Sequence, residues 1–268
     1  TVYVVRRGHY AFRPYGRIMN IFIYDGSVVG LLSCIFFSYS NKIKPDFIYT
    51  DAVQYTMCDI TYDIASDEIK AERVERKLKT ICGNEIIKTL TDALRYKDET
   101  KHKIVFDYVC EIIDTNSSLR ENFINAKSRD FIFMLDKIYF EVHRFTGFIR
   151  FMETEEGIFY APFEPDNDIV DLLLPHFAAR YGNIPFVLHD VKRNKMSMSN
   201  GKERKTVNCD SPVTIYLSEN ETNFVDLWKA YYKSVNIVSR KNLRQMRNYM
   251  PTRYNKYAPE KHETNLVF

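Results

Sequence analysis

The chain has 268 residues, of which 45% are hydrophobic and 15% aromatic, and a formal net charge of +3. This apolar content excludes a mainly disordered chain, and the length is enough for one or two closely packed domains. The longest apolar stretch, residues 28–37, contains Gly30 and Ser33 and is roughly half the length of a membrane span. It therefore predicts a buried helix and no membrane segment.

The cysteines and the start of the chain predict a cytoplasmic protein. The five cysteines form no CxxC pair, which favours reduced thiols over zinc or iron–sulfur sites. Residues 1–18 lack the continuous apolar stretch of a secretory signal. Met19 opens the string MNIFIYDGS, which is typical of a natural start. We therefore expect residues 1–18 to be an upstream extension or a non-native addition, and residues 19–268 to form one compact domain with a sub-boundary near 115–130.

The first half of the chain is predicted to be mainly helical. The string from Met19 predicts an apolar strand, a turn at Asp25-Gly26 and a helix capped by Ser27. Apolar residues at helical spacing then predict three further helices: one at 66–83 that is capped by Ser66, and two more at 104–113 and 131–142.

After Gly147 the apolar period changes to that of strands. FIRFM and IFYAP predict a hairpin, a helix follows from Asp166 or Asp168 to Gly182, and PFVLHDV with KMSMSNGKERKTV predicts two more strands. The order strand–strand–helix–strand–strand indicates a small antiparallel sheet with a helix on one face. Residues 227–235 and 240–249 are expected to form a basic helical hairpin at the C-terminus. The predicted fold class is α+β, mainly helical.

The strongest functional signal is a run from Leu227 to Ala258 without an acidic residue, in which cations alternate with aromatic rings. A second basic stretch surrounds the predicted hairpin at 192–206. Cations mixed with rings suit a polyanion that also offers faces for stacking, which favours a nucleic acid. A docking surface for an acidic protein, simple solvation and aromatic packing in a core remain alternatives. The candidate contacts in these two stretches are Lys192, Arg193, Lys195, Lys229, Lys233, Arg240, Lys241, Arg244, Arg253, Tyr254 and Lys256.

The string EVHRFTGFIRF, residues 141–151, carries further cations at a predicted change from helix to strand. Arg150 alternates with apolar residues, which would place it on the exposed face of a strand, where it can meet a phosphate. Arg144 is a second candidate contact. Capping of the helix C-terminus by Arg144 and His143 is the alternative.

A catalytic site is predicted from histidines that have carboxylates nearby. Glu141, His143, His176 and His189 could gather in one cleft for acid–base chemistry near neutral pH. Their spacings match no metal motif, and the usual phosphate loops and nucleophile elbows are absent. We therefore expect no metal and no cofactor. Separate local roles for each histidine are the alternative.

Several strings resemble a bacterial family of conserved proteins assigned to DNA metabolism. They occur in the family's order and cover about residues 19–262: YDGS, EVHRFTGFIRF, YAPFEPDND, PHFAARY, HDVKRN, LWKAYYKSVNI and SRKNLRQMRNYMPTRYNKYAPE. The chain departs from the pattern at Asn255, where the family tends to have tryptophan.

This resemblance implies an accessory protein that binds nucleic acid, with DNA favoured, and acts with a radical S-adenosylmethionine protein in DNA repair or modification. Related domains occur fused to modules similar to uracil-DNA glycosylase. Two alternatives remain open: an enzyme that acts on nucleic acid through the His/Glu site, and a protein-docking module that touches no nucleic acid.

Overall fold

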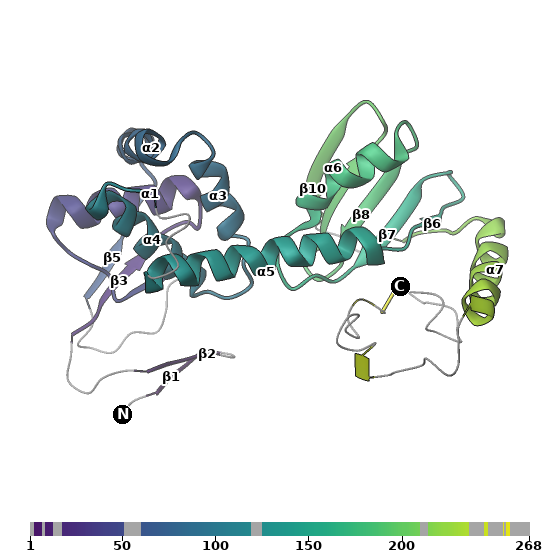
Figure 1. Cartoon of the computed structure of the whole chain (residues 1–268), viewed down its shortest axis with the longest axis horizontal. Coiled ribbons are helices and arrows are strands. Elements are labelled where there is room, and N and C mark those ends of the chain that lie inside the picture. Colours follow the sequence, from purple (N-terminus) through teal and green to yellow (C-terminus); the bar gives the residue numbers. More distant parts are fainter. Residues whose placement is uncertain are drawn as a thin grey trace. The chain divides into compact units, whose positions relative to one another are not determined.

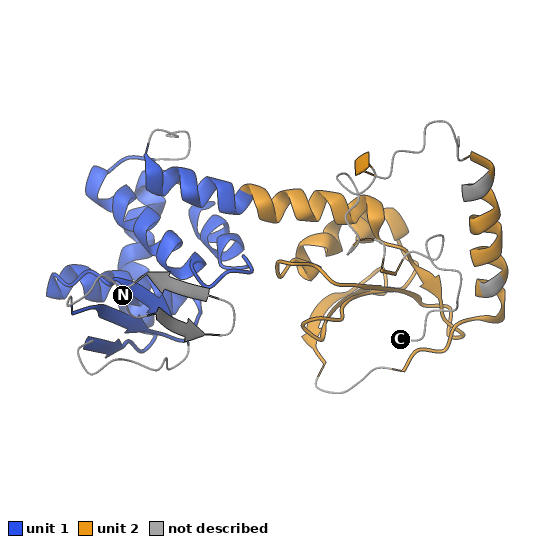
Figure 2. Ribbon diagram, turned by 90° about the horizontal axis from the view of Figure 1, so that it is seen from below, with its two compact units in different colours: residues 1–135 blue, residues 136–268 orange. Residues whose placement is uncertain are grey.

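The computed structural model describes residues 3–6, 9–12, 18–50, 60–118, 125–209, 214–235, 244–245, 254 and 256–257. These residues form an α+β fold with seven helices (Figure 1). The chain divides into two compact units, Thr1–Leu135 and Asp136–Phe268 (Figure 2). The division lies within helix α5, Ala126–Phe148, just beyond the expected sub-boundary near 115–130.

Unit 1 contains a three-stranded parallel sheet with β3 at its centre, and four helices packed with it. The strands, in spatial order, are β4 (Phe47–Tyr49), β3 (Asn20–Ile23) and β5 (Ile60–Asp63). The helices are α1 (Val28–Asn41), α2 (Glu68–Cys82), α3 (Ile86–Ala93) and α4 (Lys101–Thr115). A separate antiparallel hairpin joins β1 (Tyr3–Arg6) to β2 (His9–Phe12). Whether residues 1–18 are native to the protein stays a prediction.

The predicted strand, turn and helix after Met19 are confirmed. Gly26 takes a φ of 81°, and the Ser27 side chain accepts a hydrogen bond from the Gly30 backbone N–H at 2.9 Å. The predicted helix at 66–83 is also present, but its cap is Asp67, which accepts from the Lys70 N–H at 3.0 Å. Ser66 instead donates to Asp25, because the parallel sheet brings the ends of β3 and β5 together.

Gly30, in the first turn of α1, has no room for a side chain. A Cβ atom there would lie 2.3 Å from Asp25 Oδ1 and 2.7 Å from Tyr24 Cδ2. We expect Gly30→Ala to push Asp25 away from Ser27 and to lower the free energy of unfolding by about 1–3 kcal/mol, measured by urea denaturation with circular dichroism. Gly147 in α5 is the matched control, because a Cβ there meets nothing within 4 Å. An equal loss at both glycines would contradict the steric argument.

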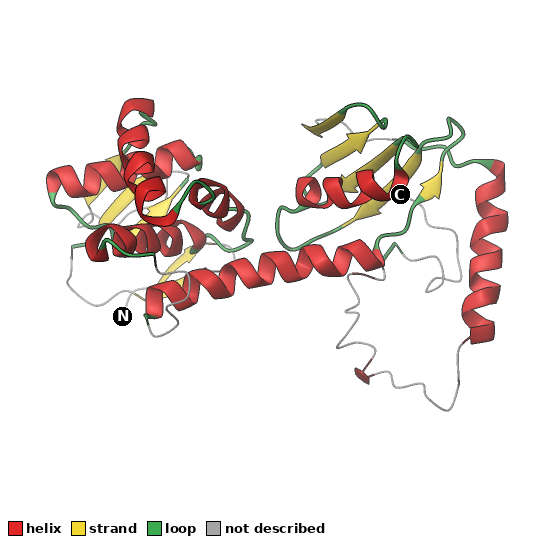
Figure 3. Cartoon of the chain, turned by 45° about the horizontal axis from the view of Figure 1, so that its top comes forward, coloured by secondary structure: helices red, strands yellow, loops and turns green. Residues whose placement is uncertain are grey.

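Unit 2 contains a five-stranded sheet in the order β10-β9-β8-β7-β6, with helix α6 packed on one face (Figure 3). The strands are β6 (Met152–Glu153), β7 (Phe159–Phe163), β8 (Phe186–Asp190), β9 (Lys195–Ser199) and β10 (Arg204–Asn208). The helices after α5 are α6 (Val170–Tyr181) and α7 (Glu219–Val235). Tyr181 of α6 meets Phe186 of β8 with ring centroids 5.5 Å apart, which fixes the helix against the sheet.

The predicted antiparallel sheet needs one correction. β7 and β8 pair in parallel, with Ala161 opposite Leu188, whereas the neighbouring strand pairs are antiparallel. The cause is α6, since a helical crossover returns the chain to start the next strand in the same direction. The first predicted strand is also shorter than expected, because α5 continues to Phe148 and places Arg150 in the following loop.

Two other expectations concern helices. The first helix of the basic hairpin corresponds to α7, which begins at Glu219 rather than Leu227. The second, predicted at 240–249, lies outside the described residues apart from 244–245. In the part of the chain that the structure describes, no helix has the length and apolar character needed to cross a membrane.

Candidate functional site: a pocket of rings and arginines

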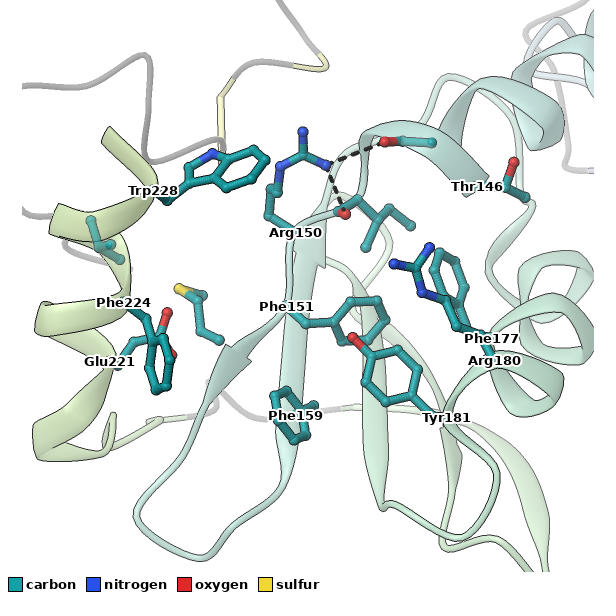
Figure 4. Close-up of a pocket in the computed structure, with 14 residues that line it drawn as sticks. Thr146, Arg150, Phe151, Phe159, Phe177, Arg180, Tyr181, Glu221, Phe224 and Trp228 are labelled. Carbon is teal, nitrogen blue, oxygen red and sulfur yellow. Dashed lines mark hydrogen bonds between the residues drawn. The ribbon is translucent and has the colours of Figure 1, made fainter. Parts of the chain in front are cut away.

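A pocket of about 440 Å³ lies in unit 2, between the end of α5, strands β6 and β7, and helices α6 and α7 (Figure 4). Its volume falls in the range of sites for small molecules. Six aromatic side chains and two arginines line it: Phe151, Phe159, Phe177, Tyr181, Phe224, Trp228, Arg150 and Arg180. The lining of the pocket is therefore chiefly aromatic, and the two arginines give it positive charge.

One wall of the pocket is a packed aromatic cluster. Phe151 lies 5.0 Å from Phe177 and 4.7 Å from Tyr181, measured between ring centroids. Tyr181 also contacts Phe159 at 5.5 Å. Phe177 is buried beneath the wall, whereas Phe151, Phe159 and Tyr181 keep part of their surface exposed. Burial raises the pKa of the Tyr181 hydroxyl, which stays protonated at neutral pH.

Helix α7 supplies the opposite wall, with Phe224 and Trp228 (Figure 4). Glu221 anchors this helix, because one of its carboxylate oxygens accepts a hydrogen bond from the Glu153 backbone N–H of β6 at 2.9 Å. Burial raises the pKa of the Glu221 carboxyl. Trp228 is 38% exposed, so its ring remains open to a ligand.

Arg150 lies at the pocket between these walls. Its Nη1 atom donates to the carbonyl oxygens of Gly147 and Ile149 at 3.2 and 3.3 Å. Its guanidinium carbon lies 5.4 Å from the centre of the Trp228 ring, in a cation–π contact. Arg180 is exposed at the last turn of α6. A ligand in this pocket can thus meet a ring and a cation together.

Glu141 was predicted as part of a catalytic cleft, but in the structure its carboxylate binds the backbone of the loop before α6. It is buried, and its two oxygens accept hydrogen bonds from the backbone N–H groups of Asp166 and Asn167 at 2.8 and 2.9 Å, and from the Asn167 side chain at 2.7 Å. These bonds hold the loop before α6 to α5. A carboxylate occupied in this way is poorly placed to transfer protons.

The three predicted histidines occupy different environments. His143 and His176 are exposed on α5 and α6, whereas His189 is buried on β8 and shares a hydrogen bond of 2.5 Å with the Tyr160 hydroxyl. Burial lowers the pKa of His189, which favours its neutral form. The pocket of rings and arginines contains none of them. Among the described residues, no group of three or more His, Cys, Asp or Glu side chains is placed to hold a metal ion.

Three predicted nucleic-acid contacts are ion-paired in the structure. The pairs are Arg193 with Asp190, Lys195 with Asp168, and Lys256 with Glu164. Each acid offsets the charge that a phosphate would need, so these cations mainly fasten loops of unit 2. The sequence did not reveal the pairs of Lys195 and Lys256, because Asp168 and Glu164 are far from them along the chain, whereas Asp190 is only three residues from Arg193.

Two further candidates pack against rings. Tyr254 is buried, with its ring centroid 4.6 Å from that of Phe145 and 5.5 Å from that of Phe148. This position does not fit the predicted stacking on bases. The Arg144 guanidinium carbon lies 4.3 Å from the centre of the Phe140 ring.

The remaining predicted cations are open or not described. Lys192 and Arg244 are exposed, and Lys229 is partly exposed. Arg240, Lys241, Arg253 and the side chain of Lys233 lie outside the described residues.

Sequence reasoning found Arg150 and missed most of its neighbours. Phe151, Arg180 and Tyr181 fall in strings that were recognised, FIRF and AARY, and Trp228 is the first ring in the run of cations and rings. Their convergence had no signal in the sequence, because the pocket draws on five elements from residue 146 to residue 228.

The fold and the pocket define a two-unit α+β protein with a basic, ring-lined site in its second unit. Residues 99–260 match the family DUF4130, described as a domain of unknown function. Because the match covers more than half of the chain, the protein belongs to this family. No curated protein matches the chain.

Proposed function

We propose that this protein binds nucleic acid, with DNA favoured, as an accessory protein in DNA repair or modification. The observation that carries the proposal is the contact of Arg150 with the ring of the part-exposed Trp228, 5.4 Å between guanidinium carbon and ring centre. Arg180 adds a second cation to the same pocket. Nucleic acids combine phosphate charge with flat rings, and proteins that bind single strands use cations and aromatic side chains side by side.

Exposed cations elsewhere in unit 2 support the same proposal. Lys202, Arg204 and Lys205 are exposed at the β9–β10 turn and on the edge strand β10. Such contacts to phosphates add affinity with little preference for sequence. We also propose a partner protein, a radical S-adenosylmethionine enzyme. This part of the proposal rests only on the resemblance of the sequence strings to the family.

The salt dependence of binding tests this proposal. We expect a labelled single-stranded oligodeoxynucleotide to bind more weakly as salt rises, and Arg180→Gln to reduce the slope of log K against log salt by about 0.7. Fluorescence anisotropy at several salt concentrations measures both. Arg76→Gln, at an exposed arginine of unit 1, is the control and should leave the slope unchanged. Absence of binding at low salt would overturn the proposal.

A second candidate function is protein docking, favoured by one face of α7. Leu227, Tyr231 and Val235 follow at helical spacing and are 66%, 55% and 51% exposed. Large exposed apolar side chains in a row are typical of protein contact surfaces. A protein that shows no salt-dependent binding of nucleic acid would leave docking as the better supported function.

A further inference from the structure

We propose that the pocket of rings and arginines takes one unstacked nucleotide, with its base against Trp228 and the Phe151–Tyr181 wall and its phosphate at Arg150 or Arg180. This inference rests on the proposed function and deepens it. The shared chemistry is a flat ring joined to a phosphate, which a free nucleotide and a turned-out nucleotide of a strand both offer.

The ring faces in the pocket determine which form of nucleic acid fits. In a duplex the faces of each base are covered by its neighbours, so an aromatic side chain can stack only on a base that has left the stack. Trp228 and Phe151 come from separate elements on opposite sides of the pocket (Figure 4). The site therefore favours single strands, or a base turned out of a duplex.

The position of the arginines fits the charge of such a ligand. Arg150 lies against Trp228 while its Nη1 atom is oriented by the carbonyls of Gly147 and Ile149. Arg180 lines the same pocket beside Phe177 and Tyr181 of the aromatic cluster (Figure 4). A base stacked on either wall can thus bring its phosphate to a guanidinium, Arg150 or Arg180. The guanidinium is the planar donor group best suited to phosphate oxygens.

The aromatic wall is set before any ligand arrives. Phe151 is packed against the buried Phe177 and against Tyr181, and it also contacts Phe186 at 6.0 Å. On the other side, the hydrogen bond from Glu153 to Glu221 ties α7 to the sheet. Side chains fixed in this way lose less freedom when a ligand binds, which raises affinity.

Paired ligands and paired variants test the inference. The ligands are a short single-stranded oligodeoxynucleotide, a strand of equal length made of abasic sugars, and the corresponding duplex. The variants are Trp228→Leu and, as a matched control in the same unit, Tyr216→Leu, which changes an exposed ring that does not line the pocket. Binding is measured by anisotropy at low salt, and thermal melting checks that each variant is folded.

We expect the base-containing strand to bind more tightly than the abasic strand and the duplex. Trp228→Leu should weaken binding of the base-containing strand by about 5- to 100-fold and leave the abasic strand unchanged, because stacking on one base supplies that difference. Tyr216→Leu should change neither. Since Trp228 is the one tryptophan of the chain, quenching of its fluorescence by thymidine 5′-monophosphate would identify a free nucleotide as a ligand of the same site.

Three results would overturn the inference, and they are distinguishable. Equal affinity for the abasic and base-containing strands, with normal salt dependence, removes the stacking site and leaves the proposed function intact. No binding of any strand removes both. An equal loss in Trp228→Leu and Tyr216→Leu would also count against the pocket, since only the first changes its lining.

Discussion

Glu141→Ala should destabilise unit 2 by roughly 3–5 kcal/mol. The Glu141 carboxylate is buried and accepts hydrogen bonds from the backbone N–H groups of Asp166 and Asn167 and from the Asn167 side chain. Alanine would remove the acceptor of these three hydrogen bonds, and each buried donor that loses its acceptor costs about 1–3 kcal/mol. Urea denaturation followed by the fluorescence of Trp228, which lies in the same unit, measures the loss.

The control for this change is Asp136→Ala, an exposed acid on the same helix. We expect a change within about 0.5 kcal/mol there. Under conditions where the Glu141→Ala variant is folded, it should bind nucleic acid with the same salt dependence as the wild type. Loss of stability at both positions, or at neither, would show that the loop before α6 does not depend on Glu141.

The sequence predicted local structure well where chemistry marks the ends of elements. The strand before Asp25, the turn at Gly26 and the cap at Ser27 all depend on residues within a few positions of one another. The parallel pairing of β7 with β8 and the parallel sheet of unit 1 could not be read in this way. Strand period reports which side chains share a face, but it does not report which strand lies alongside or in which direction.

The same distinction explains the candidate site. Arg150 was found because its alternation with phenylalanines is local, although the structure places it in a loop instead of a strand. The positive charge that Lys195 and Lys256 offer to a ligand was overestimated, because the acids that pair with them, Asp168 and Glu164, are remote in sequence. A run without acids therefore predicts local charge and not the electrostatic surface. Each aromatic residue of the pocket can be found in the sequence, but only the folded chain brings these residues together.

Arg193→Ala should destabilise unit 2 by about 3–5 kcal/mol at neutral pH, the range found when one partner of a buried ion pair is removed. Arg193 Nη1 lies 2.8 Å from Oδ2 of Asp190, which is fully buried. The arginine also donates to the carbonyl oxygens of Pro165 and Asp166, so it joins the loop after β7 to the end of β8. Lys192→Ala, at an exposed neighbouring cation, is the control and should change stability by less than about 0.5 kcal/mol.

The pH dependence of this loss separates its electrostatic part from lost packing. Burial raises the pKa of Asp190 above its ordinary value of 3.8, and the Arg193 charge opposes that rise. A group whose pKa is raised by folding contributes stability below its unfolded pKa and loses it as pH rises through the folded pKa. Without Arg193 the pKa of Asp190 rises further, so the variant should lose more than the wild type between pH 4 and pH 7. Urea denaturation at several pH values should show a difference that shrinks toward acid pH, and a constant difference would mean that Arg193 stabilises the loop through its carbonyl contacts alone.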